Sequence, residues 1–213
     1  MNIVNIPIVD DKGITLGADC RVEYEGEICP YIAVTNGIGK RLVGHEIIKR
    51  DLNDCLHILE TLENHVTDDS ILLNALWESF ITKYGRCFAD ARSGRSIKLE
   101  ANDVPENFKE HHEYLINLRN NFSAHAGDSD SDIFEARLAL KPVSKGKELH
   151  GFYISREIVI SAAPQALLEH KEFISNVIAL VDEKLERIYK RIKEDYENID
   201  IEELYENAIF IIA

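Results

Sequence analysis

Apolar residues recur at three- and four-residue spacing through much of the chain, which is the pattern of amphipathic helices that bury one face. This spacing predicts a helix over residues 46–65 and a second over about 70–91. A third helix is predicted to begin after Asp103, which can cap it, with Pro105 tolerated in its first turn and an end near Gly127. Together these segments predict a helical core.

The longest helical segment is predicted from Pro164 to about Asn198. Its apolar positions follow a nearly heptad series: Ile174, Val177, Val181, Leu185, Ile188 and Ile192. A seam of this kind packs along another helix, either in the same bundle or in a partner. A short last helix over 201–212 ends in a run of apolar residues, so we expect this end of the chain to be docked.

Two stretches alternate between apolar and polar residues and favour strands instead. Residues 1–43 are predicted as strands and turns, and a second β segment is predicted to form a hairpin. The predicted fold class is therefore mainly α, of the α+β kind. We expect an N-terminal β-rich segment over residues 1–44, then a helical domain over 45–213 with a β-hairpin inserted at about 133–161, before the long C-terminal helix.

The chain is acidic, since 24 Lys and Arg against 38 Asp and Glu give a formal net charge of -14. This balance argues against unselective coating of DNA or RNA and against a basic membrane-surface binder, because both depend on excess Lys and Arg.

We recognise no signal peptide, and no apolar run reaches the roughly 20 residues of a membrane helix. The four cysteines lack zinc-site spacing. We expect a cytoplasmic protein with reduced thiols, no membrane partner, no metal site and no cofactor.

The strongest candidate chemistry lies at the end of the third predicted helix, in the run LRNNFSAHAG. Arg119 supplies a permanent forked charge for phosphate oxygens, and His125 can transfer a proton near neutral pH. These side chains suit a metal-free attack on a phosphodiester. On an ideal helix they lie about 120° apart, so they share a pocket only if the helix breaks near His125, a break that Gly127 favours.

The run LRNNFSAH, in an otherwise helical region, resembles the motif of the HEPN superfamily: an Arg, a polar residue, then a His after four to six residues. Arg119, Asn120 and His125 occupy these places. The preceding helix also looks like HEPN-type proteins of abortive-infection systems. The resemblance covers roughly residues 45–126 and the long helix, and leaves out both β segments. Gly127 stands where some HEPN toxins carry a Tyr that a nucleotidyltransferase antitoxin modifies, so that mode of control is not expected.

This resemblance implies an antiparallel helical bundle and a metal-independent endoribonuclease in a toxin–antitoxin or anti-phage role. It implies a homodimer in which two Arg/His motifs line one cleft. Arg119 would hold the scissile phosphate, His125 would act as general acid or base, and Asn120 would support either. The expected partners are single-stranded or tRNA-like RNA and an antitoxin or another defence-system protein.

A basic stretch precedes this motif. Between residues 83 and 98 five basic residues stand against one acid: Lys83, Arg86, Arg92, Arg95 and Lys98. In an acidic chain this stretch fits a local track for an RNA backbone. The same stretch fits equally well a solvated loop with ordinary Arg and Lys side chains.

Three further residues are candidates for supporting roles. His112 shares the helix face of Arg119, and it is either a supporting group or a helix-surface or network histidine. Asn121 either orients His125 or caps the backbone, and Tyr84 either stacks on a base or lies in the core.

The Arg/His spacing is not specific by itself. Arg50 and His57 match it in the middle of the first predicted helix, where no break lies nearby. Two alternatives to an enzyme therefore stay open. The chain fits a non-catalytic helical module that binds a nucleotide or a protein, in which Arg119 and His125 would be salt-bridged or far apart. It also fits an unrelated helical protein in which the motif occurs by chance.

Overall fold

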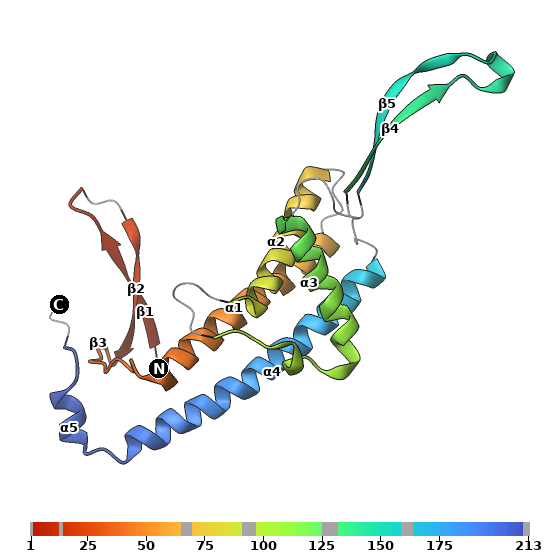
Figure 1. Ribbon diagram of the computed structural model, residues 1–213. Helices are drawn as coiled ribbons and strands as arrows, with labels where there is room; N and C mark the ends of the chain where they lie inside the picture. The colour runs from red at the N-terminus through yellow and green to blue at the C-terminus, as the bar shows by residue number, and fades with distance from the viewer. Residues whose placement is uncertain are drawn as a thin grey trace. The chain divides into compact units, whose positions relative to one another are not determined.

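The computed structural model describes residues 2–12, 15–64, 70–90, 97–124, 132–158 and 164–210. These residues form five α-helices and two antiparallel sheets (Figure 1). The mainly helical, α+β class predicted from the apolar pattern is therefore confirmed. The chain divides into two compact units, residues 1–39 with 189–213, and residues 40–188.

The larger unit is built from four helices, two of which also extend into the smaller unit: α1 (Gly37–Asn64), α2 (Ser70–Phe88), α3 (Lys109–Ala124) and α4 (Pro164–Glu197). Short 3-10 turns, η1 (Ala101–Asp103) and η2 (Glu106–Phe108), precede α3. None of the described helices is long and apolar enough to cross a membrane.

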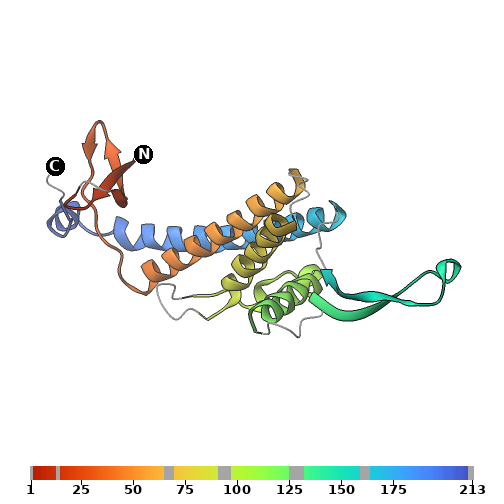
Figure 2. The same ribbon diagram turned by 90° about the horizontal axis from the view of Figure 1, so that it is seen from above.

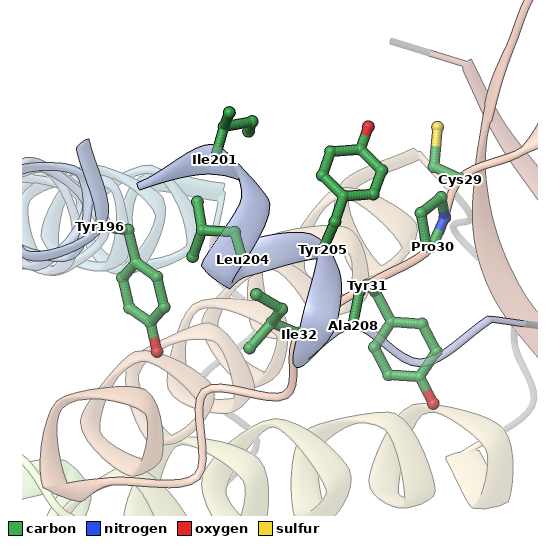
Figure 3. A pocket seen from close by; sticks show the side chains of 9 residues that line it. All are labelled: Cys29, Pro30, Tyr31, Ile32, Tyr196, Ile201, Leu204, Tyr205 and Ala208. Atoms are coloured by element: carbon green, nitrogen blue, oxygen red, sulfur yellow. The ribbon is translucent and has the colours of Figure 1, made fainter. Parts of the chain in front are cut away.

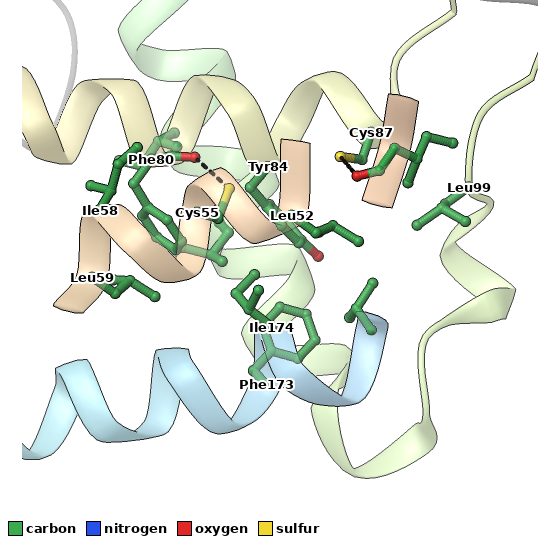
Figure 4. Close-up of a cluster of buried hydrophobic side chains, with 14 of the residues drawn as sticks. Leu52, Cys55, Ile58, Leu59, Phe80, Tyr84, Cys87, Leu99, Phe173 and Ile174 are labelled. Atoms are coloured by element: carbon green, nitrogen blue, oxygen red, sulfur yellow. Dashed lines mark hydrogen bonds between the residues drawn. The ribbon is translucent and has the colours of Figure 1, made fainter. Parts of the chain in front are cut away.

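One apolar core joins the four helices. Side chains of α1, α2 and α4 point toward one another in it (Figure 4), and Leu115 contributes from α3. Each fully buried aliphatic or aromatic side chain in such a core contributes about 1.5–3 kcal/mol relative to an exposed one. The largest of them include Tyr84, Phe80, Phe173, Leu52, Leu59 and Ile174.

The heptad seam of α4 packs within this core. Its first four positions are buried, from Ile174 to Leu185, whereas Ile188 and Ile192 are half-buried. Of the two partners that the sequence left open, the same bundle therefore covers most of the seam.

Helix α1 begins nine residues before the predicted start at Glu46, so the predicted boundary between residues 44 and 45 falls inside it. Asn36 caps it, because its Oδ1 accepts the backbone N–H groups of Ile38 at 3.1 Å and Gly39 at 3.0 Å. Gly39 looked like a loop residue, but a Cβ there would overlap the carbonyl oxygen of Val34. This glycine therefore serves close packing inside the helix.

Helix α3 begins later than predicted, at Lys109, because Asp103 does not cap it. The Asp103 carboxylate accepts the backbone N–H of Glu100 at 2.9 Å and pairs with the ammonium of Lys184 in α4 at 2.6 Å. Pro105 lies between the two 3-10 turns. Asp103 thus ties the segment before α3 to helix α4 and does not cap α3.

In the smaller unit a three-stranded sheet runs in the order β1 (Asn2–Val9), β2 (Thr15–Tyr24), β3 (Glu27–Ile28). The turn between β2 and β3 places Glu25 and Gly26 at φ 52° and 89°, the left-handed region that Gly favours. Helix α5 (Ile201–Glu206) also belongs to this unit, and it ends earlier than the predicted 212.

The described part of the apolar C-terminal run meets the N-terminal segment through a backbone bridge, while the side chains of Ile209 and Phe210 stay 46% and 61% exposed. Residues 211–213 lie outside the described part, so docking of the whole apolar run stays a prediction. Ile209 donates its N–H to the carbonyl of Tyr31 at 2.8 Å, and Tyr31 donates back at 3.2 Å. After residue 206 the chain leaves the helical conformation and forms this bridge. Beside it lies an apolar pocket of about 330 Å³ lined by residues that include Tyr31, Tyr196, Leu204 and Tyr205 (Figure 3). The C-terminal residues thus group with the N-terminal sheet, in contrast to the single domain expected over 45–213.

The inserted hairpin consists of β4 (Asp132–Leu140) and β5 (Leu149–Ile158). A 3-10 turn, η3 (Val143–Lys145), lies between the strands. The pairing is antiparallel over nine residue pairs, with a register shift between Ala139 and Leu140. The hairpin predicted at about 133–161 is therefore present, with its strands ending at Ile158.

Two histidines meet in the core. His111 Nε2 lies 2.5 Å from His170 Nδ1, and the rings of Trp77 and Phe80 flank His170. The other nitrogen of His170, Nε2, is buried and has no hydrogen-bond partner among the described residues. Burial, and next the nearby His111, lower the pKa of His170 from 6.5 to about 4. Burial also lowers the pKa of His111, against the opposing charge of Glu169.

We predict that the protein loses stability as pH falls below 6.5. The unfolded His170 takes up a proton near pH 6.5 and the folded one only near 4, so acid favours the unfolded state. The loss between pH 7.5 and pH 5 is about 2 kcal/mol for this residue. Urea unfolding across pH should show this slope in the wild type and less of it in His170→Phe. Unchanged slopes in His170→Phe would contradict the assignment, and the exposed His57→Gln is the control.

Candidate functional site

Arg119 lies near the end of α3, where its side chain packs against Gly85 of α2. A Cβ built on Gly85 of α2 would lie 2.7 Å from Cγ and 3.0 Å from Cδ of Arg119, closer than carbon atoms pack. A glycine within a helix costs about 1 kcal/mol relative to alanine. The absence of a side chain at position 85 therefore allows the aliphatic stem of Arg119 to lie directly on α2.

The guanidinium of Arg119 has a neutral neighbour. Its Nη1 donates to Oδ1 of Asn120 at 3.2 Å. Arg119 is half-buried and Asn120 is exposed. Among the described residues no carboxylate pairs with Arg119, so its position is held by packing and an amide while its charge is not neutralised. The structure thus brings together two of the three residues of the predicted motif.

The third residue, His125, lies outside the described residues. Asn121 belongs to α3 through its backbone, and its side chain is likewise outside the described part. The pairing of Arg119 with His125, and the orienting role of Asn121, stay predictions.

Like Arg119, His112 faces α2. It lies seven residues earlier in α3, so the two residues are about 10 Å apart along the helix axis. Its Nδ1 lies 2.6 Å from the hydroxyl of Tyr84, and its ring packs on Phe88 at 4.4 Å between centroids. Burial lowers the pKa of His112 from 6.5, which favours the neutral ring. Of the roles that the sequence left open, this arrangement supports a network histidine that is tied into the core.

Tyr84 is a core residue. Its side chain is fully buried between Phe88, His112 and Phe173, and burial raises its pKa. Of the two roles that the sequence left open, this arrangement supports packing, because the ring has no open face for an RNA base.

A polar groove of about 510 Å³ runs beside α3. It is lined by Asn102 of η1 and by Lys109, His112 and Asn117 of α3, among others. Nε2 of His112 has no hydrogen-bond partner among the described residues, and this imidazole nitrogen, two amides, the Lys109 ammonium and the Glu113 carboxylate border the space beside apolar Ile116. The groove gives a polar ligand access to α3 within a few residues of Arg119.

The described members of the basic stretch are engaged within the fold. Lys83 pairs with Asp54 at 2.8 Å, and Lys98 pairs with Asp90 at 2.9 Å. Arg92 and Arg95 lie outside the described residues. An RNA backbone would have to displace these carboxylates from Lys83 and Lys98, so binding of RNA along this stretch stays a prediction.

Arg86 makes the most buried of these contacts. Its Nε and Nη2 bind the two carboxylate oxygens of Asp51 at 2.9 and 2.5 Å, and the Asp51 side chain is fully buried. The sequence reasoning missed this pair. A signal exists, because Asp51 occupies a position of α1 between Ile48 and Leu52 that the helical period assigns to the apolar face.

Among the described residues, no group of three or more His, Cys, Asp or Glu is arranged to hold a metal ion. Comparison of the chain with models of protein families, with curated proteins and with solved structures found no match. The functional interpretation therefore depends on this chain's own residues.

We predict that Gly85→Ala displaces Arg119. Elsewhere in a helix this substitution stabilises by about 1 kcal/mol, but here the new Cβ meets Cγ of Arg119. Urea unfolding should show lower stability than the wild type. Gly85→Ala combined with Arg119→Ala should recover the helix-propensity gain, because the obstructing stem is gone. Stabilisation by Gly85→Ala alone would show that the contact does not constrain Arg119.

We predict that Arg86→Ala lowers the free energy of unfolding by up to about 3 kcal/mol, because it leaves the buried Asp51 carboxylate with only the guanidinium of Arg50, whose Nη2 lies 3.9 Å from Oδ1. The double variant Asp51→Asn, Arg86→Ala should recover part of this loss, since it removes the buried charge. Denaturant titration measures both values. Lys98→Ala, which removes exposed ion pairs with Asp90 and Glu100, is the control and should change stability much less than Arg86→Ala.

Proposed function

We propose that the protein is a metal-independent endoribonuclease of the HEPN type. It acts in the cytoplasm in a toxin–antitoxin or anti-phage role, and its substrate is single-stranded or tRNA-like RNA. The observation that carries this proposal is Arg119, a half-buried arginine that has no carboxylate partner among the described residues and is seated on Gly85. A guanidinium held in place with its charge unneutralised suits the binding of a phosphate.

In the proposed reaction, His125 removes the proton of a ribose 2′-hydroxyl, and the 2′-oxygen attacks the adjacent phosphorus. The bond to the 5′-oxygen breaks, and that oxygen takes a proton from the protonated His125 or from water. Arg119 stabilises the charge that builds up on the phosphoryl oxygens, and Asn120 holds the guanidinium through the contact at 3.2 Å. The products carry a 2′,3′-cyclic phosphate and a 5′-hydroxyl.

The runner-up is a non-catalytic helical module that binds a nucleotide or a protein. Two observations favour it: the described basic residues Lys83, Arg86 and Lys98 are paired with carboxylates, and the β4–β5 hairpin exposes apolar side chains. The guanidinium of Arg119, which has no carboxylate partner among the described residues, supports the enzyme over the salt-bridged form of the module. The other form of the module, in which Arg119 and His125 lie too far apart to share a phosphate, stays open because His125 lies outside the described residues.

The test is cleavage of labelled single-stranded RNA and tRNA in the presence of a chelator. We predict that Arg119→Ala and His125→Ala each lower the rate about 100-fold or more. Arg50→Ala and His57→Ala, at a similar spacing on α1, should leave it unchanged. The wild type should yield 2′,3′-cyclic phosphate ends and lose activity with added salt.

Strict dependence on magnesium, or equal activity in the wild type and His125→Ala, would overturn the mechanism. A wild type that binds RNA or a nucleotide but cleaves no RNA in either condition would favour the non-catalytic module.

A further inference from the structure

The β4–β5 hairpin has one apolar face and one polar face. Residues directly opposite in an antiparallel pair project to the same side. The register places three apolar pairs on one face: Ala136 with Ile154, Leu138 with Phe152, and Leu140 with Leu149. The other face carries Glu135 with Ser155 and Arg137 with Tyr153.

The apolar face is exposed to solvent. Phe152 is 79% exposed, Leu140 71%, Ile154 65% and Leu138 59%, and none of them belongs to the buried core. Figures 1 and 2 both show the hairpin as a two-stranded ribbon that no helix of the larger unit covers. With Leu149 at 54%, these side chains present on the order of 500 Å² of apolar surface. Isolated two-stranded hairpins are marginally stable in water, so a face of this kind indicates a docking surface.

The polar face is suited to water. Arg137 Nε donates to Glu135 Oε2 at 2.6 Å, so the charges on this side are paired along the strand. The two faces therefore differ in what they suit: the polar face can stay in water, whereas the apolar face is exposed and no described element packs on it.

Charge indicates what covers the apolar face. The chain carries a net charge of -14, so two copies repel each other over most of their surface. Residues 132–158 hold five basic and four acidic side chains, and the three apolar pairs carry no charge. The hairpin is therefore a place where two acidic copies can meet without this repulsion.

The same face is complementary to itself. A two-fold axis brings equivalent apolar rows together, as in isologous dimers. Two such faces bury about 1,000 Å² in total, which is the lower limit for a specific interface. We propose that two copies of this chain associate through the apolar faces of their β4–β5 hairpins, packed face to face about a two-fold axis. This association does not depend on RNA cleavage.

The experiment is sedimentation and light scattering of the full chain from about 1 μM to about 100 μM, the range of weak dimers. The wild type should show a monomer–dimer equilibrium. Leu138→Ser with Phe152→Ser should raise the dissociation constant at least about tenfold, since buried aromatic anchors carry most of such energy. Tyr153→Ser, next to Phe152 on the polar face and 49% exposed, is the matched control and should not change it.

A second measurement keeps the test independent of folding defects. With Cys20 and Cys29 replaced by Ser, Ala136→Cys on the apolar face should link two copies through a short bismaleimide, whereas its exposed neighbour Glu135→Cys should not. Circular dichroism confirms that each variant keeps its helices.

A wild type that is monomeric at every concentration would overturn the proposal, as would equal cross-linking at positions 135 and 136. Binding of a monomeric wild type to phosphatidylcholine or phosphatidylserine vesicles, lost in the Leu138→Ser, Phe152→Ser variant, would assign the face to a membrane instead.

Discussion

Burial of one aromatic face of α2 is the interaction on which the helical unit depends. The face meets the other three helices at once. The backbone carbonyl of Phe80 is within 3.7 Å of the Cys55 thiol of α1, and Tyr84 contacts His112 of α3 and Phe173 of α4. Because these side chains are fully buried, a shift of α2 would disturb all of the packing between helices.

The candidate site follows from this arrangement. Gly85 comes directly after Tyr84, so the residue that follows a core anchor of α2 also receives the side chain of Arg119 from α3. Arg119 is positioned by this contact, and no carboxylate among the described residues pairs with its guanidinium. By contrast, Lys83 and Arg86 of the same helix are tied to carboxylates of α1. The basic residues of α2 and Arg119 of α3 thus differ in role, because those of α2 pair with carboxylates of α1 and Arg119 packs on Gly85.

The β4–β5 hairpin differs from the helices in how its apolar side chains are packed. The helices bury their apolar faces against one another, and the hairpin, whose strands pair mainly with each other, leaves its apolar face in water. A net charge of -14 restricts what such a face can meet, and the near-neutral composition of residues 132–158 favours a copy of itself. The inserted hairpin is therefore the surface that we propose for assembly of two copies, and the helical unit contains the Arg119 site.

The sequence by itself determined the helices, the hairpin and the Arg119–Asn120 segment, because hydrophobic period and motif spacing are local properties. It did not determine where α1 begins, since Gly39 marks a turn or a tight contact depending on what lies beside it. The burial of Asp51, the His111–His170 contact and the core position of Tyr84 depend on residues far apart in the chain. Only the tertiary structure decided these features, because a charge, a ring nitrogen or a missing Cβ acquires its role from the neighbours that folding brings to it.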